Sequence, residues 1–179
     1  DTHFIGELNT MSEDQKAGDA GGPVPLFYSA PEPLSADAHG SWRLGEGDFA
    51  FAAETPFVPV VVGEIAPAMH AYPIVFSAGD AHPIAVMGVE RENLFVTEGS
   101  WAVGAYVPAY VRRYPFGFIP TINPDGFVLA IDAAADRVRK EGDEGTALFE
   151  NAEPSELTRQ ALAFCDAFQG QAMATRAFA

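Results

Sequence analysis

Two adjacent arginines surrounded by aromatic residues are the most suggestive group of side chains in the sequence. A guanidinium can bind a carboxylate or phosphate through two parallel hydrogen bonds, and aromatic rings can stack on it. The candidate binding site for a ligand or partner therefore comprises Trp101, Tyr106, Tyr110, Arg112, Arg113 and Tyr114. The alternative, that the two arginines have only a structural role, stays open. Successive helical residues point about 100° apart, so both arginines do not easily face one ligand, and either could complement a helix C-terminus or pair with an acid.

Glu64, His70 and His82 are the weaker candidates, for catalysis. A carboxylate and imidazoles can act as a general base or ligate a metal. Glu64 and His70 are six residues apart, however, which is not the spacing of one helix face, and the sequence has no His-Glu-x-x-His motif. We therefore expect no metal site. We expect His70 to form a local hydrogen bond and His39 to be solvated in a coil.

Other catalytic motifs are missing from the sequence. The single cysteine, Cys165, falls on an apolar helical stripe, where we expect it to be a small hydrophobic core residue and not a reactive thiolate. There is no Gly-x-Ser-x-Gly motif, and the seventeen glycines form neither a dinucleotide-binding nor a phosphate-binding loop. We expect no cofactor.

The charge balance excludes two classes of partner. Ten Lys and Arg residues against twenty-five Asp and Glu residues give a formal net charge of −15. Such a chain is unsuited to binding nucleic acid phosphates or anionic lipid. No apolar run reaches the roughly 18 residues of a membrane-spanning helix, and no secretory signal is visible. These features and the lone cysteine favour a cytoplasmic location, with peripheral envelope association as the alternative.

Short strands dominate the centre of the chain. β-branched and aromatic residues favour strands at 49–53, 57–62, 73–77, 83–89, 93–96, 116–119 and 127–131. Residues 78–81 are typical of a hairpin loop, and Asn123-Pro124-Asp125-Gly126 is the clearest turn. A Pro-rich segment before these strands, at 23–34, is expected to be extended coil held by Leu26, Phe27 and Tyr28.

Helices are predicted mainly in the second half. Apolar spacing indicates short helices at 63–72 and 105–114, a helical stub within 132–151 and a longer amphipathic helix after Pro154. The buried stripe of this last helix is Leu157, Ala161, Phe164, Cys165 and Phe168. Strands and helices that interleave irregularly, with hairpin-like links, predict an α+β fold with a mostly antiparallel sheet.

The chain divides into an arm and one domain. Residues 1–22 are polar, acidic and rich in Gly and Ala, which predicts a flexible arm, whereas 23–179 form a single domain. Met11-Ser12-Glu13 is typical of a translation start, so residues 1–10 are candidates for a non-native leader.

The sequence also resembles a known bacterial family. The string from Tyr106 to Phe116, with its Tyr-Val-Arg-Arg-Tyr-Pro-Phe core, is similar to the SapC-like family, named for a protein associated with surface-layer systems. Flanking segments at 48–53, 58–60, 72–76, 93–96, 145–149 and 153–155 follow in the order that the family shows. The resemblance runs from about Trp42 to the end and implies that a C-terminal piece present in many members is missing here. It implies a role in envelope systems and brings no catalytic residue.

Three hypotheses follow from these observations. The first is a non-enzymatic accessory protein that binds a protein partner or small ligand of an envelope or uptake system through the aromatic and arginine residues. The second is a small enzyme, either a hydrolase or a metal-dependent oxygenase component, that uses Glu64 with His70 or His82. The third is an acidic assembly subunit without a pocket. The missing motifs favour the first and third hypotheses.

Overall fold

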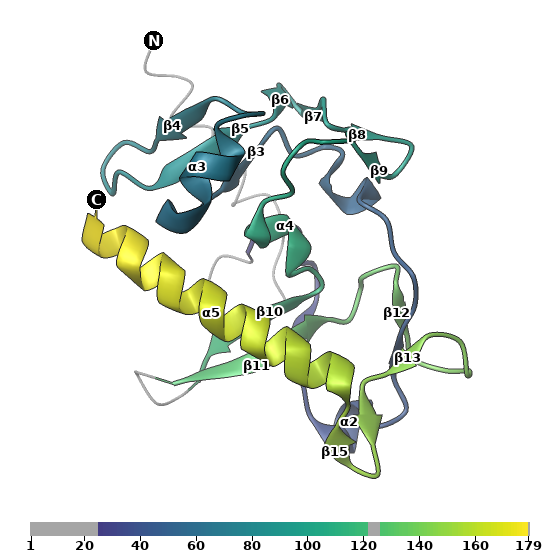
Figure 1. Ribbon diagram of the computed structural model, residues 1–179. Helices are drawn as coiled ribbons and strands as arrows, with labels where there is room; N and C mark the ends of the chain where they lie inside the picture. Colours follow the sequence, from purple (N-terminus) through teal and green to yellow (C-terminus); the bar gives the residue numbers. More distant parts are fainter. Residues whose placement is uncertain (1–24, 122–125, 179) are drawn as a thin grey trace.

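The structure, a computed structural model, describes residues 25–121 and 126–178. Most of its elements are short, and the exception is α5 (Glu156–Phe178), which crosses the molecule diagonally in Figure 1. Every strand pair of the described residues is antiparallel. The predicted α+β class is therefore confirmed, with several small antiparallel sheets.

The longest strands form a sheet in the order β1–β11–β10, namely Pro31–Pro33, Phe127–Asp132 and Phe116–Pro120. β10 and β11 are the predicted hairpin, paired from Phe116 with Ile131 to Pro120 with Phe127. The turn predicted between them lies, except for Gly126, outside the described residues. Part of the segment expected to be coil is the edge strand β1, a position that tolerates proline because outward N–H groups are not needed there.

A second sheet has the order β3–β5–β4, from Phe57–Pro59, Pro83–Val86 and Ile74–Phe76. The hairpin predicted between β4 and β5 is present. The 3₁₀ helix η2 (Val62–Glu64) leads directly into α3 (Ile65–Ala68), and all of this segment except Val62 lies within the region predicted to be helical. The strand predicted at 57–62 is limited to β3.

The remaining strands are two-residue ladders. β2 (Arg43–Leu44) pairs with both β12 (Val138–Arg139) and β13 (Thr146–Ala147). Three hairpins complete the set: β6 (Gly88–Val89) with β7 (Glu92–Asn93), β8 (Val96–Thr97) with β9 (Ser100–Trp101), and β14 (Phe149–Glu150) with β15 (Glu153–Pro154).

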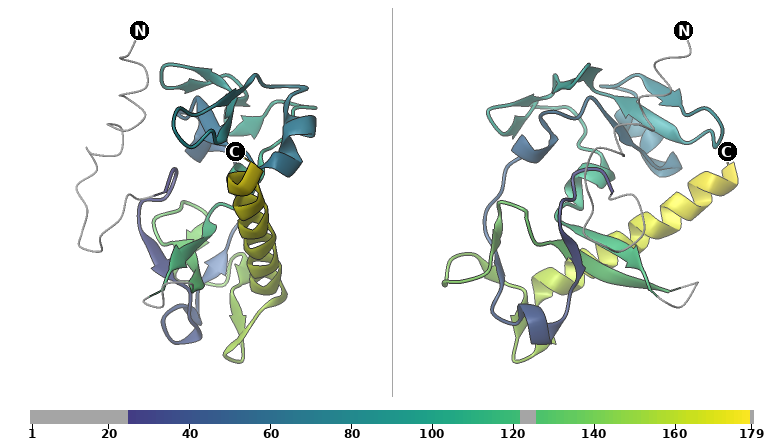
Figure 2. Two further views of the ribbon diagram at one scale, coloured as in Figure 1. Left: turned by 90° about the vertical axis from the view of Figure 1, so that its left-hand side faces the viewer. Right: turned by 180° about the vertical axis from the view of Figure 1, so that it is seen from behind.

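Helix α5 links two ends of the molecule. At its start, the Ser155 hydroxyl accepts a hydrogen bond from the Thr158 N–H at 3.3 Å, an N-cap interaction. Near its end, the Thr175 hydroxyl accepts from the Val62 N–H at 2.9 Å, which ties the helix to η2. Figure 2 shows the helix lying across β10 and reaching the region of α3. The predicted stripe is confirmed, because its five residues are buried or half-buried.

Two clusters of apolar residues form the core. One gathers around β10, β11 and α5 and includes Tyr114, Ile131 and Leu148. The other gathers around the β3–β5–β4 sheet and includes Tyr72 and Met87. Phe27 and Phe51 pack against both clusters, with their ring centroids 5.1 Å apart. As predicted, Leu26, Phe27 and Tyr28 therefore hold the N-terminal segment against the rest of the chain.

Two strand predictions were wrong. Residues 49–53 contain a 3₁₀ helix, η1 (Ala50–Ala52), because the Asp48 carboxylate accepts from the Ala50 N–H at 2.9 Å and starts a turn. The segment 93–96 is split between two hairpins. The Asn93 side chain is the cause, since its oxygen accepts from the Phe95 N–H at 3.0 Å and its nitrogen donates to the Ala52 carbonyl at 3.1 Å.

Three further expectations were also wrong. The helix predicted at 105–114 is confined to α4 (Ala109–Arg112), because Pro108 lies at its N-cap and Pro115 follows it. Residues 132–151 form short ladders instead of a helical stub, with Gly142 and Gly145 at positive φ. His39 is 2% exposed, not solvated, at the end of α2 (Ala36–His39), where it contacts Glu32 and the Trp42 ring.

The predicted arm at 1–22 lies outside the described residues. Within the part of the chain that the structure describes, no helix combines the length and apolarity needed to cross a bilayer.

Candidate functional site

A cavity of about 300 Å³ lies between α4, the start of β10 and the N-terminal half of α5. Three of its lining residues are arginines, Arg112, Arg113 and Arg137, and none of the described residues that line it is an Asp or Glu. Leu157, Phe164 and other apolar residues complete the walls. Three guanidinium groups at one cavity stand out in a chain with ten basic residues and a net charge of −15. We call this space the arginine cavity.

Both adjacent arginines line the cavity, and each guanidinium packs against an aromatic ring of α5. Arg112 is the last residue of α4 and Arg113 is its C-cap. The Arg112 Cζ lies 5.1 Å from the centroid of the Phe164 ring, and the Arg113 Cζ lies 4.7 Å from that of Phe168. The predicted stripe of α5 thus provides aromatic rings, one helical turn apart, for the two guanidinium groups.

Arg113 is held by aromatic rings and not by an acid. Its Cζ lies 4.0 Å from the Tyr110 centroid and 5.7 Å from the Tyr28 centroid. Burial raises the pKa of Tyr28, and the positive charge of Arg113 offsets part of that rise. The buried Nε of Arg113 has no hydrogen-bond partner, and no carboxylate forms an ion pair with this residue, within the described residues. A partly desolvated cation without a counter-charge favours binding of an anion.

Arg112 is oriented by a buried carboxylate. Glu64, which is 6% exposed, accepts hydrogen bonds from the Ala109 N–H at 2.6 Å and the Tyr106 hydroxyl at 2.8 Å. Arg112 Nη2 lies 3.8 Å from the same carboxylate oxygen and donates to the Tyr106 hydroxyl at 3.2 Å, while its Nε donates to the Val107 carbonyl at 3.0 Å. Burial and the hydrogen bond to Glu64 raise the pKa of Tyr106. This network fixes Arg112 at the rim of the cavity.

Arg137 contributes the third guanidinium from the segment before β12. Its Nε donates to the Gly45 carbonyl at 3.4 Å, and no ion pair joins it to a described carboxylate. Its side chain passes over Gly47, where a Cβ would lie 2.8 Å from the Arg137 Cδ. Burial lowers the pKa of Arg137, so an anion beside it would restore a favourable environment for its charge.

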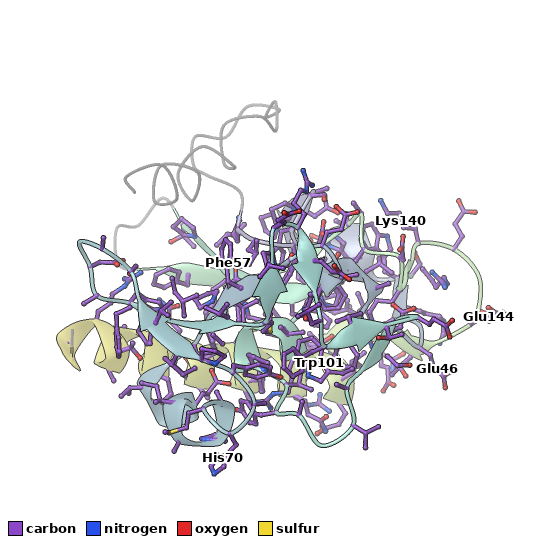
Figure 3. All side chains as sticks on the ribbon, turned by 90° about the horizontal axis from the view of Figure 1, so that it is seen from above. Glu46, Phe57, His70, Trp101, Lys140 and Glu144 are labelled. Carbon is purple, nitrogen blue, oxygen red and sulfur yellow. The ribbon has the colours of Figure 1, made fainter. Side chains whose placement is uncertain are left out.

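Most of the predicted aromatic residues are buried. Tyr110 and Tyr114 are each 8% exposed and Trp101 is 9% exposed, so their rings belong to the core. Tyr114 lines the cavity and donates to the Asp132 carboxylate at 3.0 Å. Trp101, labelled in Figure 3, lies in the interior and donates to the Tyr72 hydroxyl at 3.1 Å. These residues position the arginines or the core, whereas Arg112 is the exposed member of the predicted set.

No hydrogen bond or ion pair of the described residues links the candidate catalytic residues Glu64, His70 and His82 to one another. His70 is exposed, points away from the molecule in Figure 3 and contacts the Ala66 carbonyl through Nδ1 at 2.8 Å. His82 lies between β4 and β5, where burial lowers its pKa. No group of three or more His, Cys, Asp or Glu residues in the described part of the chain could hold a metal ion.

Cys165 lines the arginine cavity from α5. It is buried, as the apolar stripe predicts, and burial raises its pKa to about 11. The thiol therefore stays protonated near neutral pH, which makes it a poor nucleophile.

Two residues that sequence reasoning missed matter here. Arg137 belongs to no recognisable motif, and the only sequence signal for its role was that basic residues are scarce in this chain. Asp132 gave no signal at all. It is 1% exposed and accepts from Tyr114 and from the N–H groups of Ser29 and Ala30, at 3.1 and 2.7 Å, which fixes the N-terminal segment beside β11.

Comparisons with known proteins give one positive result. The SapC family model matches residues 34–179, which is most of the chain. No curated protein and no solved structure matches the chain. Since the family model covers well over half of the sequence, the chain belongs to the SapC family.

Proposed function

We propose that this protein is a non-enzymatic accessory protein that binds an anionic group in the arginine cavity. The observation that carries the proposal is three guanidinium groups around one cavity with no Asp or Glu among its described lining residues. The anionic group belongs to a small ligand or to a partner protein. A carboxylate or phosphate suits the site, because guanidinium groups bind either one through paired hydrogen bonds.

The way the arginines are held supports binding. Arg113 rests on aromatic rings and Arg137 on a backbone carbonyl, so each is positioned without being neutralised. Removing a cation from water without a counter-charge is unfavourable, and a bound anion relieves that cost. The net charge of −15 repels anions at long range, so recognition depends on contacts inside the cavity.

A catalytic role has less support than binding. The two oxygens of Glu64 already accept hydrogen bonds from Tyr106, Ala109 and Val61. Such a carboxylate is well suited to holding Arg112 and poorly placed to take a proton from a substrate. Cys165 is a protonated thiol near neutral pH. The cavity therefore offers binding groups and no activated nucleophile among its described lining residues.

The setting of the proposed function comes from the family. Membership in the SapC family supports a role in a surface-layer or cell-envelope process, because that is what the family is named for. We infer that the protein acts there as an accessory component.

Isothermal titration of the full chain, at fixed ionic strength, tests the proposal with acetate, benzoate, sulfate and inorganic phosphate. At least one anion should bind saturably. Arg113→Gln should weaken that binding about tenfold or more, the expected loss for one charge-assisted hydrogen-bonding group of about 1.5–3 kcal/mol. Arg91→Gln is the matched control, because Arg91 forms an exposed ion pair with Glu54 and does not line the cavity.

A second variant guards against a folding defect. Arg137→Gln removes a cavity guanidinium that does not stack on an aromatic ring in the described structure, so it should keep the fold and still lower affinity. Circular dichroism checks that each variant is folded. Absence of saturable binding by every anion, or equal binding by both folded arginine variants and the wild type, would overturn the proposal.

A further inference from the structure

A second, larger cavity adjoins the arginine cavity. Its volume is about 660 Å³, and it shares the lining residues Leu44, Arg137 and Leu157 with the arginine cavity. Beyond these it is bounded by the two residues that follow β2, by β12, by the loop before β13 and by the first residue of β13. Volumes of roughly 300–1,000 Å³ are typical of small-molecule sites, so the pair can hold a ligand with two chemically different parts.

The two cavities differ in charge. The arginine cavity has three cations, whereas the second cavity combines Arg137 and Arg139 with Glu46 and Glu144. Figure 3 shows Glu46 and Glu144 near each other at one edge of the molecule. Thr146 adds a hydroxyl, whereas the carbonyls of Gly45 and Gly145 already accept from Arg137 and Arg43. The second cavity is therefore balanced in charge and rich in both hydrogen-bond donors and acceptors.

This balance narrows the chemistry of the second part of the ligand. A second anion would face Glu46 and Glu144, and a cation would face Arg137 and Arg139. An apolar chain would displace water from all four ionic groups without replacing its hydrogen bonds. Hydroxyl groups both donate and accept, so they satisfy guanidinium and carboxylate groups together.

Arg137 lies where the two parts would join. It lines both cavities, and its Nε bond to Gly45 leaves the two terminal nitrogens of the guanidinium for a ligand. The Arg43 Nη1 donates to the Gly145 carbonyl at 2.8 Å, which fixes the loop on the far side of the second cavity. One guanidinium can thus contact an acidic group on one side and a neighbouring hydroxyl on the other.

We propose that the ligand is an anionic carbohydrate, with its acidic group in the arginine cavity and its hydroxyl groups in the second cavity. This inference rests on the proposed function, since it names the class of molecule that the arginine cavity takes. The acid can be a carboxylate, as in a sugar acid, or a phosphate, as in a sugar phosphate.

The test is isothermal titration of the full chain, at fixed ionic strength, with four probes: glucuronic acid, glucose 6-phosphate, glucose and hexanoate. At least one of the two acidic sugars should bind at least tenfold more tightly than both glucose and hexanoate. The tighter of the two acidic sugars then identifies carboxylate or phosphate as the preferred acid. If hexanoate binds as tightly as both acidic sugars, or more tightly, the carbohydrate inference is wrong and the anion site stands. If no probe binds, the carbohydrate inference is wrong, and the titrations with acetate, benzoate, sulfate and inorganic phosphate decide separately whether the anion site stands.

A glutamate variant tests the second cavity directly. Through charge alone, Glu144→Gln would strengthen the binding of every anion. The amide keeps one acceptor oxygen but replaces the other with an NH₂ donor and removes the charge that strengthens hydrogen bonds from hydroxyl groups, so binding of the better acidic sugar should weaken at least fivefold, or about 1 kcal/mol. Glu144 is exposed and has no hydrogen bond among the described residues, so the variant should fold. Glu54→Gln is the matched control, as an exposed carboxylate outside both cavities. Unchanged or tighter binding of the acidic sugar by Glu144→Gln would overturn the inference.

Discussion

Replacing Glu64 by alanine should destabilise the protein strongly, because this carboxylate joins two parts of the chain. It accepts from the Val61 N–H at 3.3 Å on its own side, and from Tyr106 and Ala109 on the other. Ala109 begins α4, which presents Arg112 and Arg113 to the arginine cavity. The variant therefore tests whether Glu64 has the structural role that we assign to it.

The size of the effect follows from the groups left without partners. The N–H groups of Val61 and Ala109 are in buried residues, and a buried donor that loses its partner costs about 1–3 kcal/mol. Tyr106 is half-buried and Arg112 is exposed, so water can replace Glu64 at both. We expect a loss of about 3 kcal/mol in the free energy of unfolding for Glu64→Ala. For Glu64→Gln we expect about 1 kcal/mol, because the amide oxygen can still accept from Ala109.

Urea unfolding followed by circular dichroism measures these differences. With a slope of about 2 kcal/mol/M, the midpoint of Glu64→Ala should fall by about 1.5 M. Glu54→Ala is the control, since its exposed ion pair with Arg91 should contribute less than about 1 kcal/mol. A midpoint for Glu64→Ala within about 0.3 M of the wild type would refute the reasoning, as would a larger loss for glutamine than for alanine.

Two further predictions concern alkaline pH and glycine. Burial raises the pKa of Tyr28, Tyr114 and Cys165, so these groups keep protons in the fold that the unfolded chain releases at high pH. The free energy of unfolding should therefore fall between about pH 8.5 and 11, through Cys165 over the whole range and through the two tyrosines above about pH 10. Urea midpoints that do not change over this range would contradict the burial of these groups. Gly88→Ala would place a Cβ 1.8 Å from the Glu92 carbonyl oxygen and should cost about 1–3 kcal/mol, whereas Gly170→Ala, in open space on α5, should stabilise by up to about 1 kcal/mol. Thermal melts that move in the same direction for both variants would contradict this contrast.

The parts of the fold that sequence reasoning predicted are those fixed by local pattern. Helix α5 has a regular apolar stripe, which appears in the structure as expected, and it begins after Pro154 as predicted. The β4–β5 and β10–β11 hairpins also follow from apolar runs separated by turn residues. In each case, neighbouring residues alone determine the outcome.

The parts that were missed depend on side chains that satisfy distant backbone groups. Asn93 bonds to the Ala52 carbonyl, 41 residues away, and thereby breaks a predicted strand into two hairpins. Asp132 accepts from the N–H groups of Ser29 and Ala30, about 100 residues away. Spacing along the chain carries no signal for such contacts, since the partner is set by tertiary packing.

Sequence reasoning identified two arginines of the candidate site but not their arrangement around one cavity. Arg112 and Arg113 were identified, yet helical geometry indicated that both do not easily face one ligand. The structure brings both to one cavity because α4 ends at Arg112 and α5 places an aromatic ring against each guanidinium. Arg137 joins them from a segment that had been predicted to be helical stub and loop. This arrangement could be predicted only with knowledge of the path of α5 across the molecule.

The cavity stays cationic in an acidic protein because its arginines are positioned by neutral groups. An ion pair would hold a guanidinium equally well, but it would also cancel the charge that a ligand needs. Arg113 uses aromatic rings and Arg137 uses a carbonyl, so only Arg112 approaches a carboxylate within the described residues. That carboxylate, Glu64, also accepts hydrogen bonds from the Tyr106 hydroxyl and the Ala109 N–H. Arg113 and Arg137 are therefore held in place without losing their positive charge to an ion pair, so the cavity can accept an anion.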